Sequence, residues 1–140
     1  MRIETKEAKE ILQSGKYTLV LRGKDKTITL SERGIKPLFD LCCNGEDYKG
    51  FCAADKVVGK AAAFLYVILG VSEVFATVMS ERAVYILSRN GISAEYEQKA
   101  DNIINRSGDG MCPMEKAVWD TDRTDTAFEI IKNELKRLNN

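Results

Sequence analysis

Histidine is absent from this chain of 140 residues, which also has only two prolines and one tryptophan. Histidine is the side chain that most often completes a zinc site or serves as a general base near neutral pH. The cysteines, at positions 42, 43, 52 and 112, include no C-x-x-C pair. We therefore expect no structural zinc site and no cofactor. Acid–base chemistry would depend on carboxylates, lysines or thiols.

An excess of charge of either sign is also missing, since lysine plus arginine and aspartate plus glutamate each number 21. The chain therefore has no bulk attraction to nucleic acid or to an anionic membrane. The most apolar run, 61–71, is shorter than the roughly 20 residues that cross a bilayer. The charged start MRIETKEAKE lacks the apolar core of a signal peptide. We expect a cytoplasmic protein with reduced thiols, no membrane and no nucleic-acid partner.

The chain length fits one domain, residues 1–140. After residue 50, the strand-like runs FCAAD, EVFATVM and ISAEYE alternate with helical patterns over 56–69 and 81–90. This alternation is typical of parallel strands joined by crossover helices. Before it, YTLVL and TITL predict an antiparallel hairpin. We therefore predict an α/β fold, a three-layer α/β/α sandwich with a mixed five-stranded sheet.

The stretch ADKVVGKAAA lies where the helix after FCAA is predicted to begin. Lys56 and Lys60 would lie in its first two turns, where the helix dipole disfavours cations. Asp55 as the N-cap would offset part of this cost, which is a purely structural interpretation. In the functional interpretation, Asp55 and Lys56 face a polar ligand and Gly59 permits its close approach. Ser80, after the next strand, is expected to be an ordinary N-cap rather than a nucleophile.

A second motif, GDGMCPMEKAV, places Cys112 directly before Pro113. Proline at the first helical position and Glu115 at the third predict a helix from Cys112 to Asp120. A thiol at a helix N-terminus has a lowered pKa and attacks electrophiles more readily. In the alternative interpretation, Cys112 is a tolerated cap and Glu115 closes a capping box.

The loop before Cys112 has the residue types of an anion site. Gly108 and Gly110 would let backbone amides turn toward an anion, and Arg106 would add a positive charge. In the alternative interpretation, the glycines only make a turn. A base for Cys112 is left open among several residues: Asp55, Lys56, Asp109 and Glu115.

Three stretches, ADKVVGKAAA, GDGMCPMEKA and NGISAEYE, resemble a family of uncharacterised bacterial and archaeal proteins, a domain of unknown function whose fold is similar to that of cytidine deaminases. The resemblance spans nearly the whole chain and implies a single deaminase-like domain. Deaminases of that fold hold zinc through His or Cys and a P-C-x-x-C helix start. Here Ser80 and Ala83 stand in place of the second motif, so the residues contradict zinc-dependent deamination.

We derive two main hypotheses. The first is a metal-independent enzyme acting on a nucleotide, nucleobase or similar small polar substrate, with Cys112 as nucleophile and Asp55 or Lys56 assisting proton transfer. The second is a non-catalytic module that binds a nucleotide or other small ligand on the same fold. Several residues are expected to bind the ligand: Lys60, Arg106, Gly108, Gly110 and Glu115.

Two further expectations concern macromolecular partners. A structural or regulatory role through an apolar surface is a third hypothesis. A homo-oligomer is compatible with a small α/β domain, although no residue specifies one. Both ligand hypotheses require residues 55–60 and 106–115 to share one cavity, because the polar groups come from these two stretches.

Overall fold

A mixed sheet organises the computed structural model, which describes residues 1–105, 107–108 and 110–139. Within these residues the sheet has five strands in the order β2-β1-β3-β4-β5. The strands are β1 (Leu19–Arg22), β2 (Thr27–Leu30), β3 (Cys52–Val58), β4 (Glu73–Ser80) and β5 (Ser93–Ala100). β1 is antiparallel to both β2 and β3, and β3, β4 and β5 run parallel. The predicted mixed five-stranded α/β sheet is therefore confirmed.

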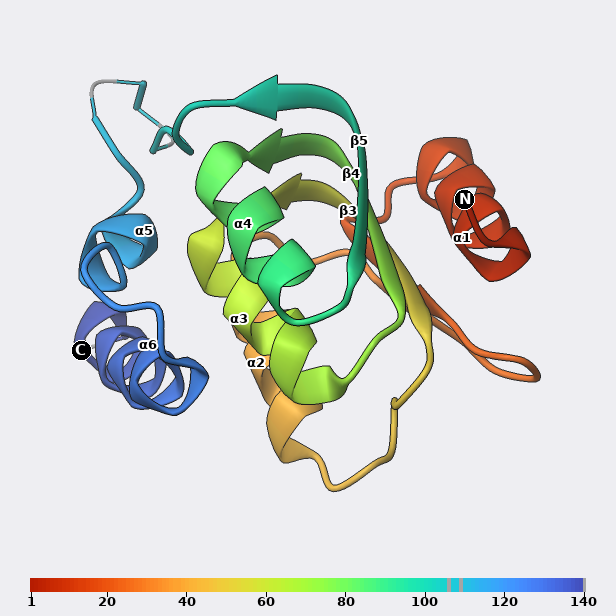
Figure 1. Ribbon diagram of the computed structural model, residues 1–140, viewed down its shortest axis with the longest axis horizontal. Coiled ribbons are helices and arrows are strands. Elements are labelled where there is room, and N and C mark those ends of the chain that lie inside the picture. The colour runs from red at the N-terminus through yellow and green to blue at the C-terminus, as the bar shows by residue number, and fades with distance from the viewer. Residues whose placement is uncertain (106, 109, 140) are drawn as a thin grey trace.

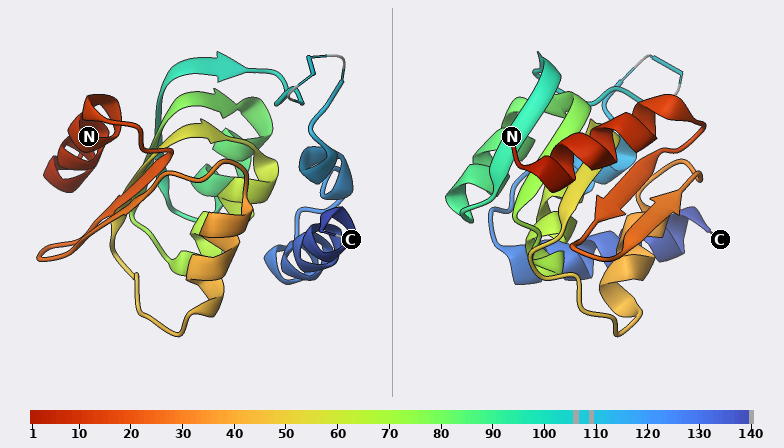
Figure 2. Two further views of the ribbon diagram at one scale, coloured as in Figure 1. Left: turned by 180° about the vertical axis from the view of Figure 1, so that it is seen from behind. Right: turned by 90° about the vertical axis from the view of Figure 1, so that its right-hand side faces the viewer.

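Helices cover both faces of this sheet (Figure 1). α1 (Ile3–Ser14) lies across one face, and α2 (Lys36–Cys43), α3 (Lys60–Leu69) and α4 (Glu81–Arg89) cover the other. Figure 2 shows the same layers from behind and from the side. α5 (Pro113–Ala117) and α6 (Thr124–Leu138) pack against α3, outside the α2–α4 layer. This outer helical layer was not predicted from the sequence.

The hydrophobic core lies mainly on the α3 face of the sheet. α3 is apolar around most of its circumference because it is enclosed between the sheet and α6. Phe64 and Leu65 are fully buried there, and each such side chain stabilises the fold by about 1.5–3 kcal/mol. A smaller cluster, which includes Ala8, Val20 and Phe75, attaches α1 to the opposite face. Packing on both faces of the sheet fixes the positions of the strand ends.

The start of α3 differs from the sequence prediction. β3 continues through Asp55 and Lys56 to Val58, which pairs with Met79 of β4, and Gly59 is the N-cap of α3. The two consecutive valines favour a strand, and the parallel neighbour provides its hydrogen bonds. The predicted helix start at Lys56 is therefore wrong, as is the N-cap role of Asp55.

Two other helix starts bear on the predictions. Ser80 is the N-cap of α4, and its hydroxyl oxygen accepts a hydrogen bond from the Ala83 N–H at 3.1 Å, as expected. Pro113 begins α5, also as expected, but this helix has only five residues and ends at Ala117. The predicted extension to Asp120 is wrong.

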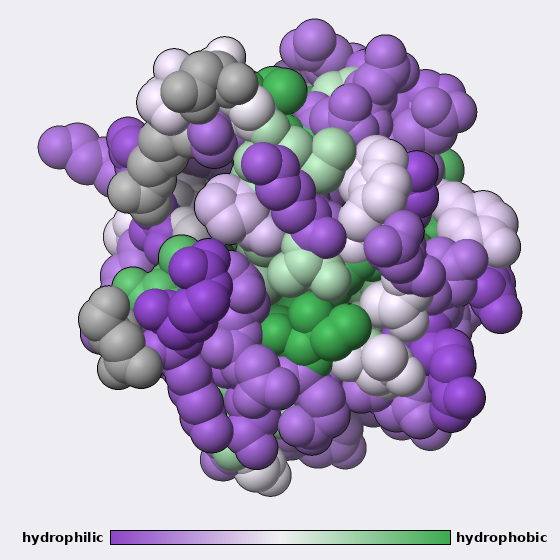
Figure 3. Space-filling view, turned by 90° about the vertical axis from the view of Figure 1, so that its left-hand side faces the viewer, coloured by the Kyte–Doolittle hydropathy of each residue, from purple (hydrophilic) through white to green (hydrophobic). Residues whose placement is uncertain are grey.

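The outer side of the molecule, over α5 and α6, is largely hydrophilic. Figure 3 shows this face, with hydrophobic side chains gathered near its middle. In the part of the chain that the structure describes, no helix combines the length and apolar character needed to cross a bilayer.

Candidate functional site

A cavity of about 450 Å³ lies at the carboxyl end of β3. Its walls come from β1 and β3, from the start of α3, from residues between Glu32 and the start of α2, and from Ile103, Cys112, Met114 and Glu115. Both stretches singled out in the sequence contribute to it: Asp55 and Lys56 from one, Cys112 and Glu115 from the other. These side chains therefore share the cavity that both ligand hypotheses require.

Asp55 is a titratable group of this cavity with a shifted pKa. It is half-buried, and its Oδ2 accepts a hydrogen bond of 2.6 Å from the Tyr66 hydroxyl, while Oδ1 accepts one of 3.3 Å from the Val57 N–H. Burial raises the pKa of Asp55 to about 6, although these hydrogen bonds oppose the rise. Near neutral pH, Asp55 can therefore both accept and return a proton.

Tyr66 was missed in the sequence analysis. It lies in α3, is fully buried, and its hydroxyl donates a hydrogen bond to Asp55. Burial, together with the Asp55 charge, raises the pKa of Tyr66 well above its usual value, so the phenol remains protonated and remains a donor. The available signal was a tyrosine inside the apolar run AAAFLYVIL, because a buried hydroxyl needs a hydrogen-bond partner.

Glu115 caps α3 rather than its own helix. Its Oε1 accepts a hydrogen bond from the Lys60 N–H at 2.6 Å, and its Oε2 accepts one from the Ala61 N–H at 2.9 Å. These bonds satisfy two of the first four N–H groups of α3, which have no partner inside the helix. A side chain at position 59 would collide with this carboxylate, so Gly59 permits the close approach of Glu115. The predicted capping box between Glu115 and Cys112 is not formed.

The Glu115 carboxylate is buried, with 6% of the residue exposed. Burial raises its pKa, and the two backbone hydrogen bonds and the charges of Lys60 and Arg82 oppose this rise. Glu115 therefore has a structural role in the wall of the cavity, because both of its carboxylate oxygens are already hydrogen-bonded to α3.

Cys112 lines the same cavity and lies directly before α5. It is half-buried, is a free thiol, and its backbone N–H donates to the Ile103 carbonyl at 3.0 Å. The thiol makes no capping hydrogen bond to α5. Because α5 is a single short helix, its dipole gives less electrostatic support to a thiolate than the predicted longer helix would.

Lys60 does not join this cavity. Its side chain is 2% exposed, and its ammonium donates to the Trp119 carbonyl at 3.0 Å and pairs with Asp122 Oδ1 at 3.1 Å. It lines a different cavity, on the side of α4 and β5. Lys60 was predicted to share a ligand site with Asp55. The structure corrects this prediction, because the Lys60 side chain extends from α3 toward Trp119 and Asp122.

The predicted glycine loop is placed only in part. Gly108 adopts a left-handed conformation, with φ of 76°, which suits glycine. Neither Gly108 nor Gly110 is among the described residues that line the Asp55 cavity. Arg106 and Asp109 lie outside the described residues. The anion-binding role of the loop stays a prediction.

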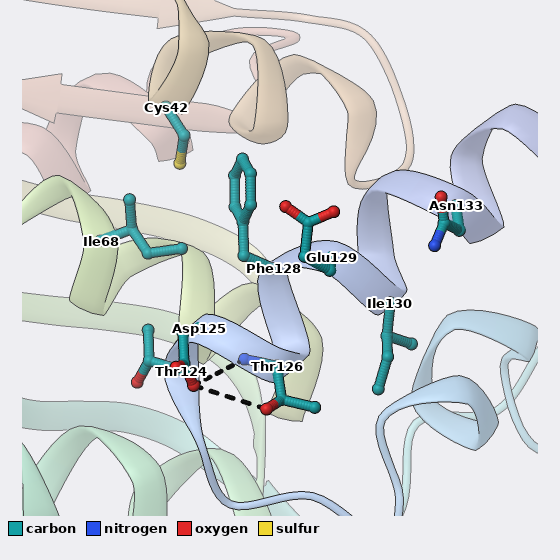
Figure 4. A pocket seen from close by; sticks show the side chains of 9 residues that line it. All are labelled: Cys42, Ile68, Thr124, Asp125, Thr126, Phe128, Glu129, Ile130 and Asn133. Atoms are coloured by element: carbon teal, nitrogen blue, oxygen red, sulfur yellow. Dashed lines mark hydrogen bonds between the residues drawn. The ribbon is translucent and has the colours of Figure 1, made fainter.

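A larger groove, of about 920 Å³, lies between α2, α3 and α6. Figure 4 shows Cys42, Ile68 and Phe128 at one end of it and Asp125, hydrogen-bonded to Thr126, at the other. Burial, with a smaller effect of Cys43, raises the pKa of Cys42 to about 12, which keeps it a thiol. The groove contains no residue that the sequence analysis assigned to the site. The cavity beside Asp55 is therefore the better candidate.

The metal chemistry of deaminases does not fit the donors at the helix starts. Ser80 uses its hydroxyl oxygen to cap α4, and Ala83 has no donor atom. Among the described residues, no group of three or more His, Cys, Asp or Glu is placed to hold a metal ion. We therefore derive no step through zinc.

Comparisons with known proteins agree on one family. The model of a family described as TM1506, domain of unknown function (DUF1893), matches residues 7–135. The crystal structure of a DUF1893 family protein (TM1506) from Thermotoga maritima is similar, with 27% sequence identity and a TM-score of 0.84, over 98% of this chain and 92% of that chain. No curated protein matches.

Proposed function

We propose that this chain, which belongs to the DUF1893 family, a domain of unknown function, is a metal-independent enzyme whose active site is the cavity beside Asp55. Its substrate is a nucleotide, nucleobase or similar small polar molecule. The observation that carries the proposal is that Asp55 and Cys112, far apart in the sequence, line one cavity in which the pKa of Asp55 is raised to about 6.

Asp55 and Cys112 divide the chemistry between them. The ionised Asp55 carboxylate accepts the thiol proton, and the resulting Cys112 thiolate attacks an electrophilic carbon of the substrate. Asp55, now protonated, returns that proton to the leaving group. Water then hydrolyses the covalent intermediate, with Asp55 accepting a proton from the water and the proton passing to the released thiolate. Tyr66 orients the carboxylate throughout through its 2.6 Å hydrogen bond.

The remaining walls support a small substrate with an anionic group. Lys56 and Arg33 are exposed at the cavity and offer positive charge to a phosphate or carboxylate. Apolar side chains, including Leu38, Ile103 and Met114, line the rest and suit the flat face of a base. Arg33 was not recognised in the sequence analysis, because it lies in a loop without periodicity.

The proposal also includes the fold and the cellular compartment in which this chemistry takes place. We place it on a cytidine-deaminase-like fold, supported by the three resembling stretches and by the helices that start at the carboxyl edge of the parallel strands. The cysteines of the described residues are free thiols, and a reducing cytoplasm would keep Cys112 in that state.

One observation favours a second function, a non-catalytic binding module on the same fold. The helix that follows Cys112 has five residues, and the thiol makes no capping hydrogen bond to it. In that case the cavity, Lys56 and Arg33 would still bind the ligand, and Cys112 would be only part of the wall.

A ligand panel separates the two functions. Thermal shift and calorimetry with nucleotides and nucleobases should reveal a ligand that binds the wild type and is turned over. Cys112→Ser should keep the affinity for this ligand and lose turnover if the cavity is catalytic. Turnover that survives Cys112→Ser would exclude the nucleophile, and the absence of any ligand in the panel would count against both functions.

A further inference from the structure

A second polar cavity, of about 460 Å³, lies at the carboxyl ends of β4 and β5. Figure 1 shows the start of α4 and the end of β5 on this side of the molecule, near α5. Lys60, Arg82 and Trp119 contribute to its walls, and it shares no described lining residue with the cavity beside Asp55. The second cavity can therefore hold a ligand of its own.

Lys60 gives this cavity a fixed wall. Its buried ammonium is satisfied by the Trp119 carbonyl at 3.0 Å and by Asp122 Oδ1 at 3.1 Å. A buried ammonium is costly unless it is paired in this way. The charges of Lys60 and Asp122 offset each other, so the electrostatic character of the cavity depends on its other charged groups.

Arg82 is the positive group that faces the cavity. Its guanidinium carbon lies 3.3 Å from the centre of the Trp119 ring, which is a close stacking contact. Within the described part of the chain Arg82 forms no ion pair with a carboxylate, although its charge opposes the rise of the Glu115 pKa. Stacking fixes the plane of a guanidinium and leaves its N–H edges available for an oxyanion.

Groups that attract a positive charge line the same cavity. The carboxylates of Glu81 and Asp101 are exposed, and Tyr85 is 54% exposed. Carboxylates and the face of an aromatic ring both attract an ammonium group. A simple anion would be repelled by the two carboxylates, and a simple cation would be repelled by Arg82. A ligand that carries both charges matches this arrangement.

We propose that this cavity binds a small zwitterion of amino-acid size. Its carboxylate lies on the Arg82 guanidinium, and its ammonium lies toward Asp101 and Glu81. The cavity volume of about 460 Å³ falls within the usual range of small-ligand sites. This site is independent of the chemistry proposed for Asp55 and Cys112.

Trp119 provides a direct probe, since it is the only tryptophan in the sequence. The experiment titrates the full chain with each of the common free amino acids, follows Trp119 fluorescence and measures affinity by calorimetry. We expect saturable binding of at least one amino acid. Its analogues without the amino group or without the carboxylate should bind about tenfold or more weakly, because each loses a charged hydrogen bond.

Matched variants assign the binding to this cavity. Arg82→Gln should weaken binding about tenfold or more, whereas Arg137→Gln, the same change at an exposed position of α6, should alter it less than about twofold. Asp101→Asn should weaken binding of the amino acid but not of its analogue without the amino group. Asp55→Asn should leave the affinity unchanged, which separates this site from the proposed active site.

Three results would overturn the proposal. One is the absence of saturable binding, by fluorescence and by calorimetry, for the whole panel. Another is equal affinity for the amino acid and for its analogue without the amino group, which would show an anion site only. The third is an equal effect of Arg82→Gln and Arg137→Gln in variants whose thermal melts show that both are folded.

Discussion

Glu115 and Lys60 connect the same two segments twice. The Glu115 carboxylate accepts the Lys60 backbone N–H at 2.6 Å, while the Lys60 ammonium reaches back to the Trp119 carbonyl at 3.0 Å. The segment that contains α5 is thereby attached to the start of α3. This attachment places Cys112 at the cavity beside Asp55 and Trp119 at the second cavity.

Replacing Glu115 should loosen this attachment. Glu115→Ala leaves two N–H groups at the start of α3 without their partner, and we expect a loss of about 2 kcal/mol in the free energy of unfolding. Urea denaturation measures the change, with Glu10→Ala on the exposed face of α1 as the control. Equal losses in the two variants would show that the long-range cap is not stabilising.

Gly59→Ala should be destabilising for a related reason. The added methyl group would meet the Glu115 carboxylate, so either the helix start or the carboxylate must move, at a cost of about 1–3 kcal/mol. In the background of Glu115→Ala the same substitution should cost much less, because the colliding group is gone. Additive costs in this double-mutant cycle would contradict the contact.

The sequence predicted the order of strands and helices, because the apolar periodicities are clear, but it misplaced the start of α3. Asp55-Lys56-Val57-Val58 fits either a strand or a helix start, and pairing with β4 decides between them. Cys112, Asp55 and Lys56, which line one cavity, were singled out because their residue types stand out beside predicted helix starts. Glu115 as a cap for α3 was not found, since it acts on a helix distant in the sequence.

Asp55 should make stability depend on pH. Its pKa is about 6 in the folded protein, above the unfolded value of about 3.9, so its favourable contribution is complete below about pH 4 and is lost as the pH rises through 6. We expect the wild type to lose on the order of 1–2 kcal/mol relative to Asp55→Asn over this range, after allowance for solvent screening. Unfolding curves from pH 4 to 7.5 test this. Asp25→Asn, at an exposed position, serves as the control, and parallel pH profiles for wild type and Asp55→Asn would contradict the shifted pKa.

Tyr66→Phe should move the titration of Asp55 upward. The hydrogen bond from the Tyr66 hydroxyl stabilises the ionised carboxylate and so lowers the pKa of Asp55. Without this bond, the effect of burial, which raises the pKa, is opposed less strongly. Carbon-13 NMR of the Asp55 carboxyl group should show a midpoint above about 6 in this variant. An unchanged or lower midpoint would mean that Tyr66 does not support the charged form.

Site-resolved alkylation of Cys112 by iodoacetamide, measured from pH 5 to 9, tests the shared chemistry of Asp55 and Cys112 most directly. The account predicts that the Cys112 rate in the wild type rises with an inflection near pH 6, as Asp55 ionises, and that Asp55→Asn removes this inflection. Cys43, which is exposed in the same chain, is the internal control and should be unaffected by Asp55→Asn. A Cys112 profile that follows that of Cys43 and is the same in Asp55→Asn would contradict the account.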